Sequence, residues 1–152
     1  LFFSGDPGTG KTFLMQCIGH RLMEDGASVI YITAPNLFDL STRYKRLQQS
    51  FRPDPDQLEE AAMLYNAFIT WDLLLIDDLG TEIATPETFA QLIAVLDTRQ
   101  SRRLGTVIAS NLKVPDFAKQ YDRRIDSRLK GDFLIYSFPP GDLRQRRAEK
   151  SE

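Results

Sequence analysis

The chain opens on a glycine-rich stretch that strongly restricts what it can fold into. Residues Gly5 to Thr12 fit the pattern G-x-x-x-x-G-K-[ST] of the phosphate-binding loop, or P-loop, which joins a strand to a helix. An apolar run comes directly before this stretch and a helical pattern follows it. The glycines permit backbone angles that let successive N–H groups point into one concavity. The stretch therefore predicts a nucleotide-binding site, but it does not say which reaction follows.

We expect the nucleotide to contact the whole of this loop. Lys11 would place its charge near the β- and γ-phosphates, and Thr12 would offer its hydroxyl to Mg²⁺. The predicted nucleotide-binding residues are Gly5, Asp6, Pro7, Gly8, Thr9, Gly10, Lys11, Thr12 and Phe13. The alternative is a Gly/Pro turn that happens to contain Lys-Thr, and the strand–loop–helix context disfavours it.

Length and composition set the class of protein. The 152 residues suffice for one domain with a sizeable core. No apolar run approaches a membrane span and no secretory signal pattern is present, so we expect a cytoplasmic protein without a membrane partner. The single cysteine, Cys17, excludes an internal disulfide, and we interpret it as a core residue. The net charge of −2 argues against general coating of nucleic acid but allows local basic patches.

The ends of the chain suggest its domain organisation. It starts on Leu1, directly on the strand that leads into the P-loop, so we expect an N-terminal region upstream that is absent here. We predict one domain over residues 1–141. Residues 142–152 are mostly charged, and we expect them to form a mobile tail.

A helix over 11–25, a strand over 28–33 and a break at 34–36 come next. We expect Asn36 to cap the following helix, whose apolar stripe is Leu37, Leu40, Tyr44, Leu47 and Phe51. Lys45 and Arg46 point away from this stripe and Arg43 flanks it. These charges fit either a solvated face or a contact with nucleic acid, and the helix alone does not decide between them. Asp54 is expected to cap the next helix.

The second strong signal is the run 73–78. Four apolar residues in a row predict a strand buried on both faces, and two carboxylates, Asp77 and Asp78, stand at its carboxyl end. This has the form of a Walker B strand. Asp77 would hold Mg²⁺ through its water shell, and Asp78 would polarise the attacking water. The alternative, an acidic loop after a strand, is disfavoured after a P-loop.

Asn111 ends the next buried strand, 106–110, which follows a helix that Thr85 caps. A polar side chain there would reach the γ-phosphate or the attacking water, although Asn is also common in turns. Two short helices and a last strand over 133–138 complete the pattern. Strands and helices that alternate in this way predict an α/β fold with a five-stranded parallel sheet and helices on both faces.

These motifs together carry a resemblance. The set 5–12, 73–80, Ser110-Asn111 and 124–129 resembles the AAA+ ATPase module of the DnaC-type bacterial helicase loaders. The closely related IstB-type transposition helpers share the same motifs. The resemblance covers nearly the whole chain, and the Asp-Asp-Leu-Gly and Ser-Asn stretches make it more specific than the P-loop alone.

The resemblance implies a P-loop NTPase sheet of order 5-1-4-3-2, ATP with Mg²⁺ as ligands, and assembly into an ATP-dependent oligomer. It makes Asn111 the sensor 1 residue and places Lys45 and Arg46, with Arg43 beside them, on a helix that faces single-stranded DNA. Arg124 matches the segment with the arginine finger that acts on a neighbouring subunit, with Arg128 as second choice and Arg123 still open. The expected partner is the replicative helicase.

Two features depart from the general pattern of AAA+ enzymes. The second acid is Asp78 where AAA+ enzymes usually have Glu, which is consistent with slow turnover. No small helical lid follows the last strand, as is common in the loaders. Three alternatives stay open: a transposition helper, an ATP-binding assembly module with negligible hydrolysis, and, more weakly, a kinase- or GTPase-type P-loop protein. The last lacks support because no Asn-Lys-x-Asp motif occurs in the sequence.

Overall fold

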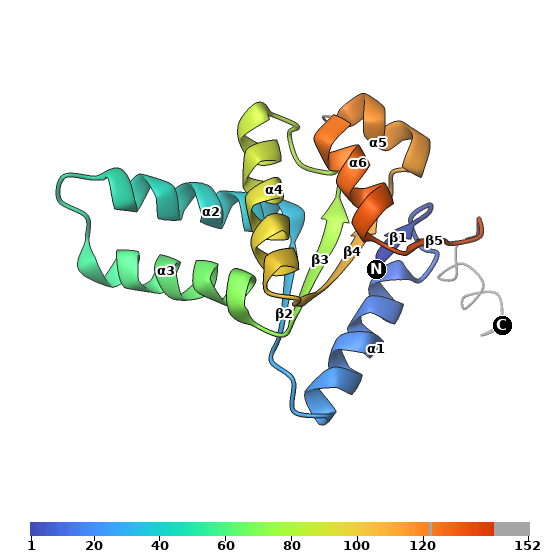
Figure 1. Ribbon diagram of the computed structural model, residues 1–152, viewed down its shortest axis with the longest axis horizontal. Coiled ribbons are helices and arrows are strands. Elements are labelled where there is room, and N and C mark those ends of the chain that lie inside the picture. Colours follow the sequence, from blue (N-terminus) through green and yellow to red (C-terminus); the bar gives the residue numbers. More distant parts are fainter. Residues whose placement is uncertain (122, 142–152) are drawn as a thin grey trace, which may run out of the picture.

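The computed structural model describes residues 1–121 and 123–141, and it contains one parallel sheet (Figure 1). The strands are β1 (Phe2–Ser4), β2 (Val29–Thr33), β3 (Leu73–Leu79), β4 (Gly105–Ser110) and β5 (Ile135–Ser137). Their order, β2-β3-β4-β1-β5, confirms the predicted order 5-1-4-3-2 read from the other edge. The tail predicted over 142–152 lies outside the described residues.

Helices cover both faces of this sheet, as predicted. They are α1 (Lys11–Glu24), α2 (Ala34–Gln49), α3 (Pro55–Thr70), α4 (Pro86–Ser101), α5 (Val114–Gln120) and α6 (Arg123–Asp132). Helix α1 packs on one face, and the apolar residues of the other five pack together on the opposite face. Within the described residues no helix follows β5.

Strand β3 is buried on both faces, as its apolar run predicts. Leu74 and Ile76 belong to the large core beneath α2–α6, whereas Leu73 and Leu75 belong to the smaller core beneath α1. Side chains alternate along a strand, so odd positions of β3 face α1. Asp77 is the last odd position that keeps the regular register with β2, so its carboxylate lies on the same face as the helix that starts at the P-loop. Leu79 comes after a register shift against β4 and belongs to the large core.

The prediction that Cys17 is a core residue is wrong, because its side chain is exposed. Helix α1 faces the sheet through Lys11, Met15 and Gly19, which recur every four residues. An added Cβ at Gly19 would lie 2.7 Å from Cδ1 of Leu75, so glycine permits the close approach of helix and sheet. Apolar residues at helical spacing, Leu14, Cys17, Ile18 and Leu22, led to the prediction for Cys17, but of these only Ile18 packs against the core beneath α1.

Helices α2 and α3 form a hairpin that projects away from the sheet (Figure 1). The expected break at 34–36 is absent: α2 begins at Ala34 directly after β2, with Thr33 as its N-cap, so Asn36 does not cap it. A proline is tolerated in a first helical turn, where its missing N–H has no partner in any case. Phe51, predicted to continue the buried stripe, is 94% exposed beyond the end of α2.

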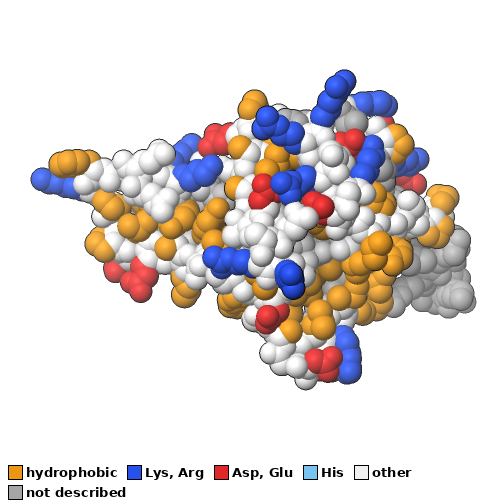
Figure 2. Space-filling view, viewed as in Figure 1, with side chains coloured by type: hydrophobic (Ala, Val, Ile, Leu, Met, Phe, Trp, Pro, Cys, Tyr) orange, Lys and Arg blue, Asp and Glu red, His pale blue; other side chains and the backbone are white. Residues whose placement is uncertain are grey.

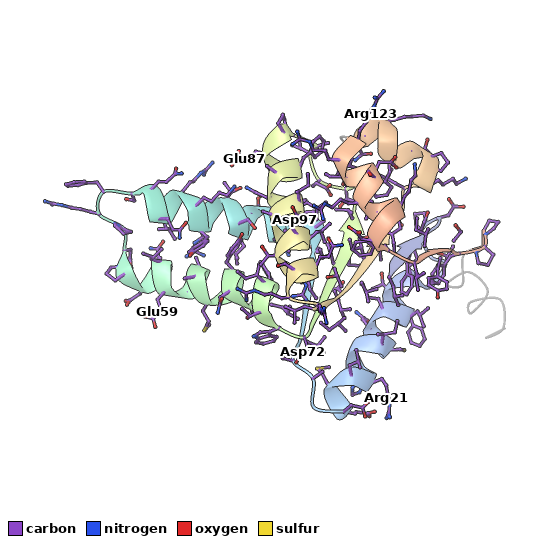
Figure 3. All side chains as sticks on the ribbon, in the orientation of Figure 1. Arg21, Glu59, Asp72, Glu87, Asp97 and Arg123 are labelled. Carbon is purple, nitrogen blue, oxygen red and sulfur yellow. The ribbon has the colours of Figure 1, made fainter. Side chains whose placement is uncertain are left out.

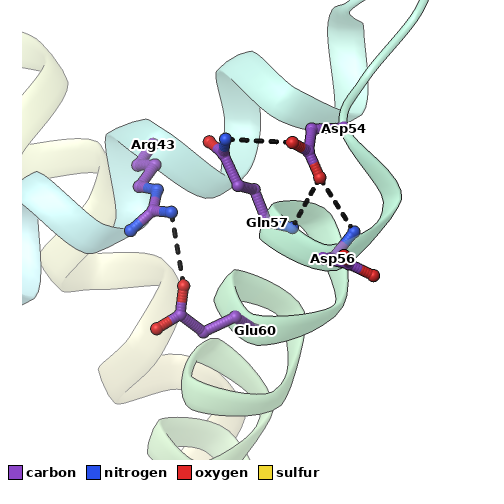
Figure 4. Close-up of polar contacts among 5 residues, drawn as sticks. All are labelled: Arg43, Asp54, Asp56, Gln57 and Glu60. Carbon is purple, nitrogen blue, oxygen red and sulfur yellow. Dashed lines mark hydrogen bonds and ion pairs between the residues drawn. The ribbon is translucent and has the colours of Figure 1, made fainter.

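The start of α3 confirms the predicted cap (Figure 4). Oδ1 of Asp54 accepts hydrogen bonds from the backbone N–H groups of Asp56 and Gln57, at 3.0 and 3.2 Å. The Gln57 side chain donates to Oδ2 of the same carboxylate at 3.2 Å, whereas in the usual capping box it would accept from the backbone N–H of the N-cap residue.

None of the helices in the described part of the chain combines the length and the apolar character that crossing a bilayer requires.

Candidate active site

The P-loop leaves β1 and winds directly into α1. Gly8 and Gly10 have φ angles of 80° and 96°, in the left-handed region that glycine adopts without strain. The Thr9 hydroxyl donates to the Asp6 carbonyl at 2.8 Å and braces the turn. No acidic residue stands in the first turn of α1, so the positive end of the helix dipole faces the loop without an internal counter-charge. This geometry suits an anion such as a phosphate.

Lys11 folds back over the loop. Its Nζ donates to the carbonyls of Gly5 and Asp6 at 2.7 and 2.8 Å, and the side chain is buried. Burial lowers the pKa of this ammonium group, while the negative charges of Asp77, Asp78 and Asp6 oppose that shift. The two predicted carboxylates therefore lie close enough to the P-loop lysine for their charges to act on it.

The predicted carboxylates sit on an irregularity in β3. Ile76 pairs with Ile108 but Leu79 pairs with Ser110, so β3 holds one extra residue against β4, which is a β-bulge. Asp78 adopts a left-handed φ of 56° and is exposed, whereas Asp77 is buried. The bulge thus turns two consecutive acids in different directions, one into the protein beside Lys11 and one toward solvent.

Asn111 follows β4 between the two motif strands. Ser110, just before it, pairs with Ser4 of β1 on one side and with Leu79 of β3 on the other. Hydroxyl groups lock these strand ends: Ser110 Oγ donates to the Leu79 carbonyl at 2.5 Å, and Ser4 Oγ donates to the Leu112 carbonyl at 2.8 Å. The half-buried Asn111 is therefore held where the P-loop strand and the acidic strand come closest.

The donor set of this edge suits a magnesium–nucleotide complex. Among the described residues no group of three or more His, Cys, Asp or Glu side chains is placed to hold a metal by itself. Mg²⁺ is commonly held by one or two protein oxygens together with phosphates and waters. Asp77 and the Thr12 hydroxyl are oxygen donors of this kind, so the residues present fit the group.

Sequence reasoning missed two polar side chains at this edge. The Tyr31 hydroxyl of β2 donates to Oδ2 of Asp77 at 2.8 Å. Glu82 accepts from the Gly80 N–H at 2.8 Å and from the Tyr121 hydroxyl, which joins the loop after β3 to the end of α5. Only the strand order reveals Tyr31, since it lies more than forty residues from Asp77, on the neighbouring strand.

The arginines of α6 differ in their surroundings. Arg128 is ion-paired with Asp97 of α4 at 2.7 Å and donates to the Gln100 side chain at 2.7 Å. Arg124 is exposed, and Arg123 points outward at the start of α6 (Figure 3). Lys and Arg side chains gather over the surface that α4, α5 and α6 form (Figure 2). Arg128 thus stabilises the packing of α6 on α4, while Arg123 and Arg124 lie on the outside.

The basic residues of α2 lie on the projecting hairpin and not at the P-loop. Lys45 and Arg46 are exposed. Arg43 is ion-paired with Glu60 of α3 at 3.3 Å (Figure 4). At the end of the hairpin a basic and a hydrophobic side chain lie together (Figure 2). These residues form a surface separate from the nucleotide site.

Comparisons with known proteins show the family and the fold. A family model described as an AAA domain matches residues 1–111. The replicative helicase loader DnaC of Buchnera aphidicola subsp. Baizongia pistaciae is 30% identical over 137 residues, which are 90% of this chain and 52% of that protein. The chain therefore spans about half the length of this relative.

Solved structures share the fold. The crystal structure of the DnaC helicase loader matches with a TM-score of 0.72 at 19% identity, over 91% of this chain and 77% of that one. The replication initiator DnaA bound to AMPPCP and single-stranded DNA matches with a TM-score of 0.76 at 22% identity. The match covers 99% of this chain and 44% of that one.

Proposed function

Because this chain belongs to the AAA domain family and is a DnaC-type AAA+ module, we propose that it binds and hydrolyses ATP within a cytoplasmic replication protein of the helicase-loader type. One observation carries the proposal: the P-loop, Asn111 and the Asp77–Asp78 bulge stand at the ends of three adjacent strands, β1, β4 and β3. Parallel sheets bind ligands at this edge.

The chain's own residues bind and orient the nucleotide. The N–H groups of the P-loop and the start of α1 hold the phosphates of ATP, and Lys11 exchanges its loop carbonyls for phosphate oxygens. Thr12 and Asp77 hold the accompanying Mg²⁺. That ion, when bound, neutralises the charge of the phosphates.

Asp78 and Asn111 act on water. Asp78, turned toward solvent by the bulge, accepts a hydrogen bond from the attacking water, and Asn111 orients that water against the γ-phosphate. The short arm of Asp78 reaches less far than a glutamate, so we expect slow turnover.

Arg124 completes the site of a neighbouring subunit in an ATP-dependent oligomer. Its outward position on α6 supports this role, and the contacts of Arg128 with α4 make Arg128 the weaker candidate. A positive charge placed where negative charge develops accelerates phosphoryl transfer by about 10³- to 10⁵-fold.

The decisive experiment is the ATPase rate per subunit against protein concentration, with and without single-stranded DNA. We expect the rate to rise with concentration and to fall about 10³-fold in Arg124→Ala, while ATP affinity stays within twofold. Arg21→Ala is the matched control, because Arg21 is an exposed, ion-paired helix arginine at the far end of α1. A concentration-independent rate unaffected by Arg124→Ala would refute the shared site. No turnover under any condition, with ATP still bound, would favour an assembly module instead.

Single-stranded DNA is the proposed ligand of the hairpin. Lys45 and Arg46 contact phosphates, with a smaller share from Arg43, whose charge is partly satisfied by Glu60. In Lys45→Ala and Arg46→Ala the slope of log affinity against log salt should fall by about 1 for each residue. The replicative helicase is the proposed partner, and a transposase takes its place if the protein is an IstB-type helper. Pull-down of each purified partner with ATP present separates the two.

A further inference from the structure

The Asp77 carboxylate is held from two sides. The Tyr31 hydroxyl donates to Oδ2 at 2.8 Å, and the backbone N–H of Asp78 donates to Oδ1 at 2.9 Å. The Asp77 residue is only 3% exposed. One donor on each oxygen fixes the plane of the carboxylate and leaves the other lone pairs as acceptors.

Tyr31 reaches this carboxylate from the edge strand. In the parallel pair of β2 and β3, Tyr31 stands opposite Leu75, so Asp77 lies one step further along the same face of the neighbouring strand. Such a diagonal neighbour is within reach of a long aromatic side chain but not of a short one. The length of tyrosine and its terminal hydroxyl therefore suit this position.

A phenol carries a single O–H. In Tyr31, a residue that is 43% exposed, this O–H is donated to the Asp77 carboxylate.

We propose that Tyr31 is a positioning residue for magnesium, whose hydroxyl holds the Asp77 carboxylate in the orientation that receives the hydrated cation accompanying ATP. This inference rests on the proposed function, in which Asp77 holds Mg²⁺. It adds an edge-strand residue outside both nucleotide motifs to the metal site. Without the phenol the carboxylate rotates between several orientations, and the cation must select one of them.

The test is Tyr31→Phe, which removes one oxygen and keeps the ring. The full chain is titrated with MgCl₂ in the presence of a fluorescent ATP analogue, and binding is also measured in EDTA. We expect the Mg²⁺ concentration for half-maximal nucleotide binding to rise at least about 10-fold, the lower end of the effect of one hydrogen bond to a charged group. Binding in EDTA should stay within twofold of wild type. Turnover at saturating Mg²⁺ should also approach wild type, because the cation then restores the orientation.

Tyr136→Phe is the matched control, since Tyr136 is a half-exposed tyrosine on β5, the opposite edge strand. Its Mg²⁺ titration should coincide with wild type. A Tyr31→Phe protein with the wild-type Mg²⁺ dependence would overturn the inference alone, and so would equal weakening with and without Mg²⁺. If wild-type protein bound no nucleotide at any Mg²⁺ concentration, the proposed function would fall and this inference with it.

Discussion

Two buried cationic side chains lie at opposite ends of the parallel strands, and they are held in different ways. Lys11, at the carboxyl ends of the strands, uses one nitrogen to contact two carbonyls of its own loop. Arg99 of α4 is fully buried beside the amino ends of β3 and β4. Its guanidinium donates to the carbonyls of Phe68, Trp71, Asp72 and Gly105 and to the Thr106 hydroxyl.

This difference in hydrogen bonding means that Lys11 can exchange its protein partners for a ligand, whereas Arg99 keeps the same protein partners permanently. A lysine ammonium is a compact charge with rotatable donors, so Lys11 can release loop carbonyls for a phosphate. A guanidinium is a planar fork, and the partners of Arg99 are backbone carbonyls and one hydroxyl at fixed positions around the end of α3 and the start of β4. Burial lowers the pKa of Arg99 to about 10, with Asp72 opposing the shift, so this group stays charged at neutral pH.

Lys11→Ala should produce the largest effect, and it should affect binding only. Loss of two charge-assisted hydrogen bonds to phosphate should weaken ATP affinity by about 10³-fold, or about 4 kcal/mol. The free energy of unfolding without nucleotide should change by less than about 1 kcal/mol, because water can solvate the released loop carbonyls. Isothermal titration and urea unfolding measure the two quantities. A large loss of stability would mean that Lys11, like Arg99, mainly stabilises the fold.

Arg99→Met should show the reverse. The buried Phe68 carbonyl and the part-buried carbonyls of Trp71 and Gly105 lose the Arg99 donor, so we expect a loss of about 3 kcal/mol in the free energy of unfolding, measured by urea denaturation. ATP affinity of the folded protein should stay within twofold, because Arg99 lies at the far edge. Arg102→Met is the control, since Arg102 is an exposed neighbour with one hydrogen bond, to the Ile69 carbonyl. ATP affinity that fell along with stability would show that the two edges are coupled.

Arg99→Lys sharpens the comparison by keeping the charge and removing the fork. A single nitrogen cannot reach all the carbonyls that the guanidinium contacts, so we expect a loss of about 2 kcal/mol, between wild type and Arg99→Met. Urea midpoints of the three proteins, measured together, give the order. Equal stability of Arg99→Lys and wild type would mean that charge alone matters at this edge.

The same contrast explains which features the sequence predicts. The P-loop and the caps at Asp54 and Thr85 depend on residues within a few positions of each other, and the structure places these caps as predicted. The buried strand at 73–76 is likewise predicted by adjacent residues, the four apolar ones in a row. The strand order followed from the family resemblance and not from any periodicity. The site residues at the ends of β1, β3 and β4 are adjacent because of that order.

The role of Arg99 has no local signature. Its partners lie near 68–72 and at 105–106, and the packing of α4 against α3 and β4 brings them together. Tyr31 is similar, because its partner Asp77 is on another strand. The prediction for Cys17 failed for a related reason: the line of α1 that faces the sheet is Lys11, Met15 and Gly19, and a charged residue and a glycine in that line give no apolar periodicity.

The smallest expected effect tests whether every hydrogen-bonded group at the carboxyl ends of the strands can exchange its partners for a ligand, as Lys11 can. Tyr121 donates to Glu82, whose other oxygen accepts from the Gly80 N–H, and Gln120 donates to the Gly80 carbonyl at 3.0 Å. These are fixed partners, like those of Arg99, although they stand beside the Asp78 bulge. Tyr121→Phe should therefore cost about 1 kcal/mol of stability in urea unfolding.

Because Gly80 follows Asp78 closely, the same substitution should also lower turnover about threefold at unchanged ATP affinity. Tyr65→Phe is the control, since Tyr65 stacks on Tyr44 within the hairpin. If Tyr121→Phe changed ATP affinity but neither stability nor turnover, the hydrogen bonds of Tyr121 and Glu82 would belong, like those of Lys11, to the groups that exchange partners when nucleotide binds. If ATP affinity stayed unchanged while stability and turnover both fell, the groups that exchange partners would be restricted to Lys11 and the P-loop that it covers.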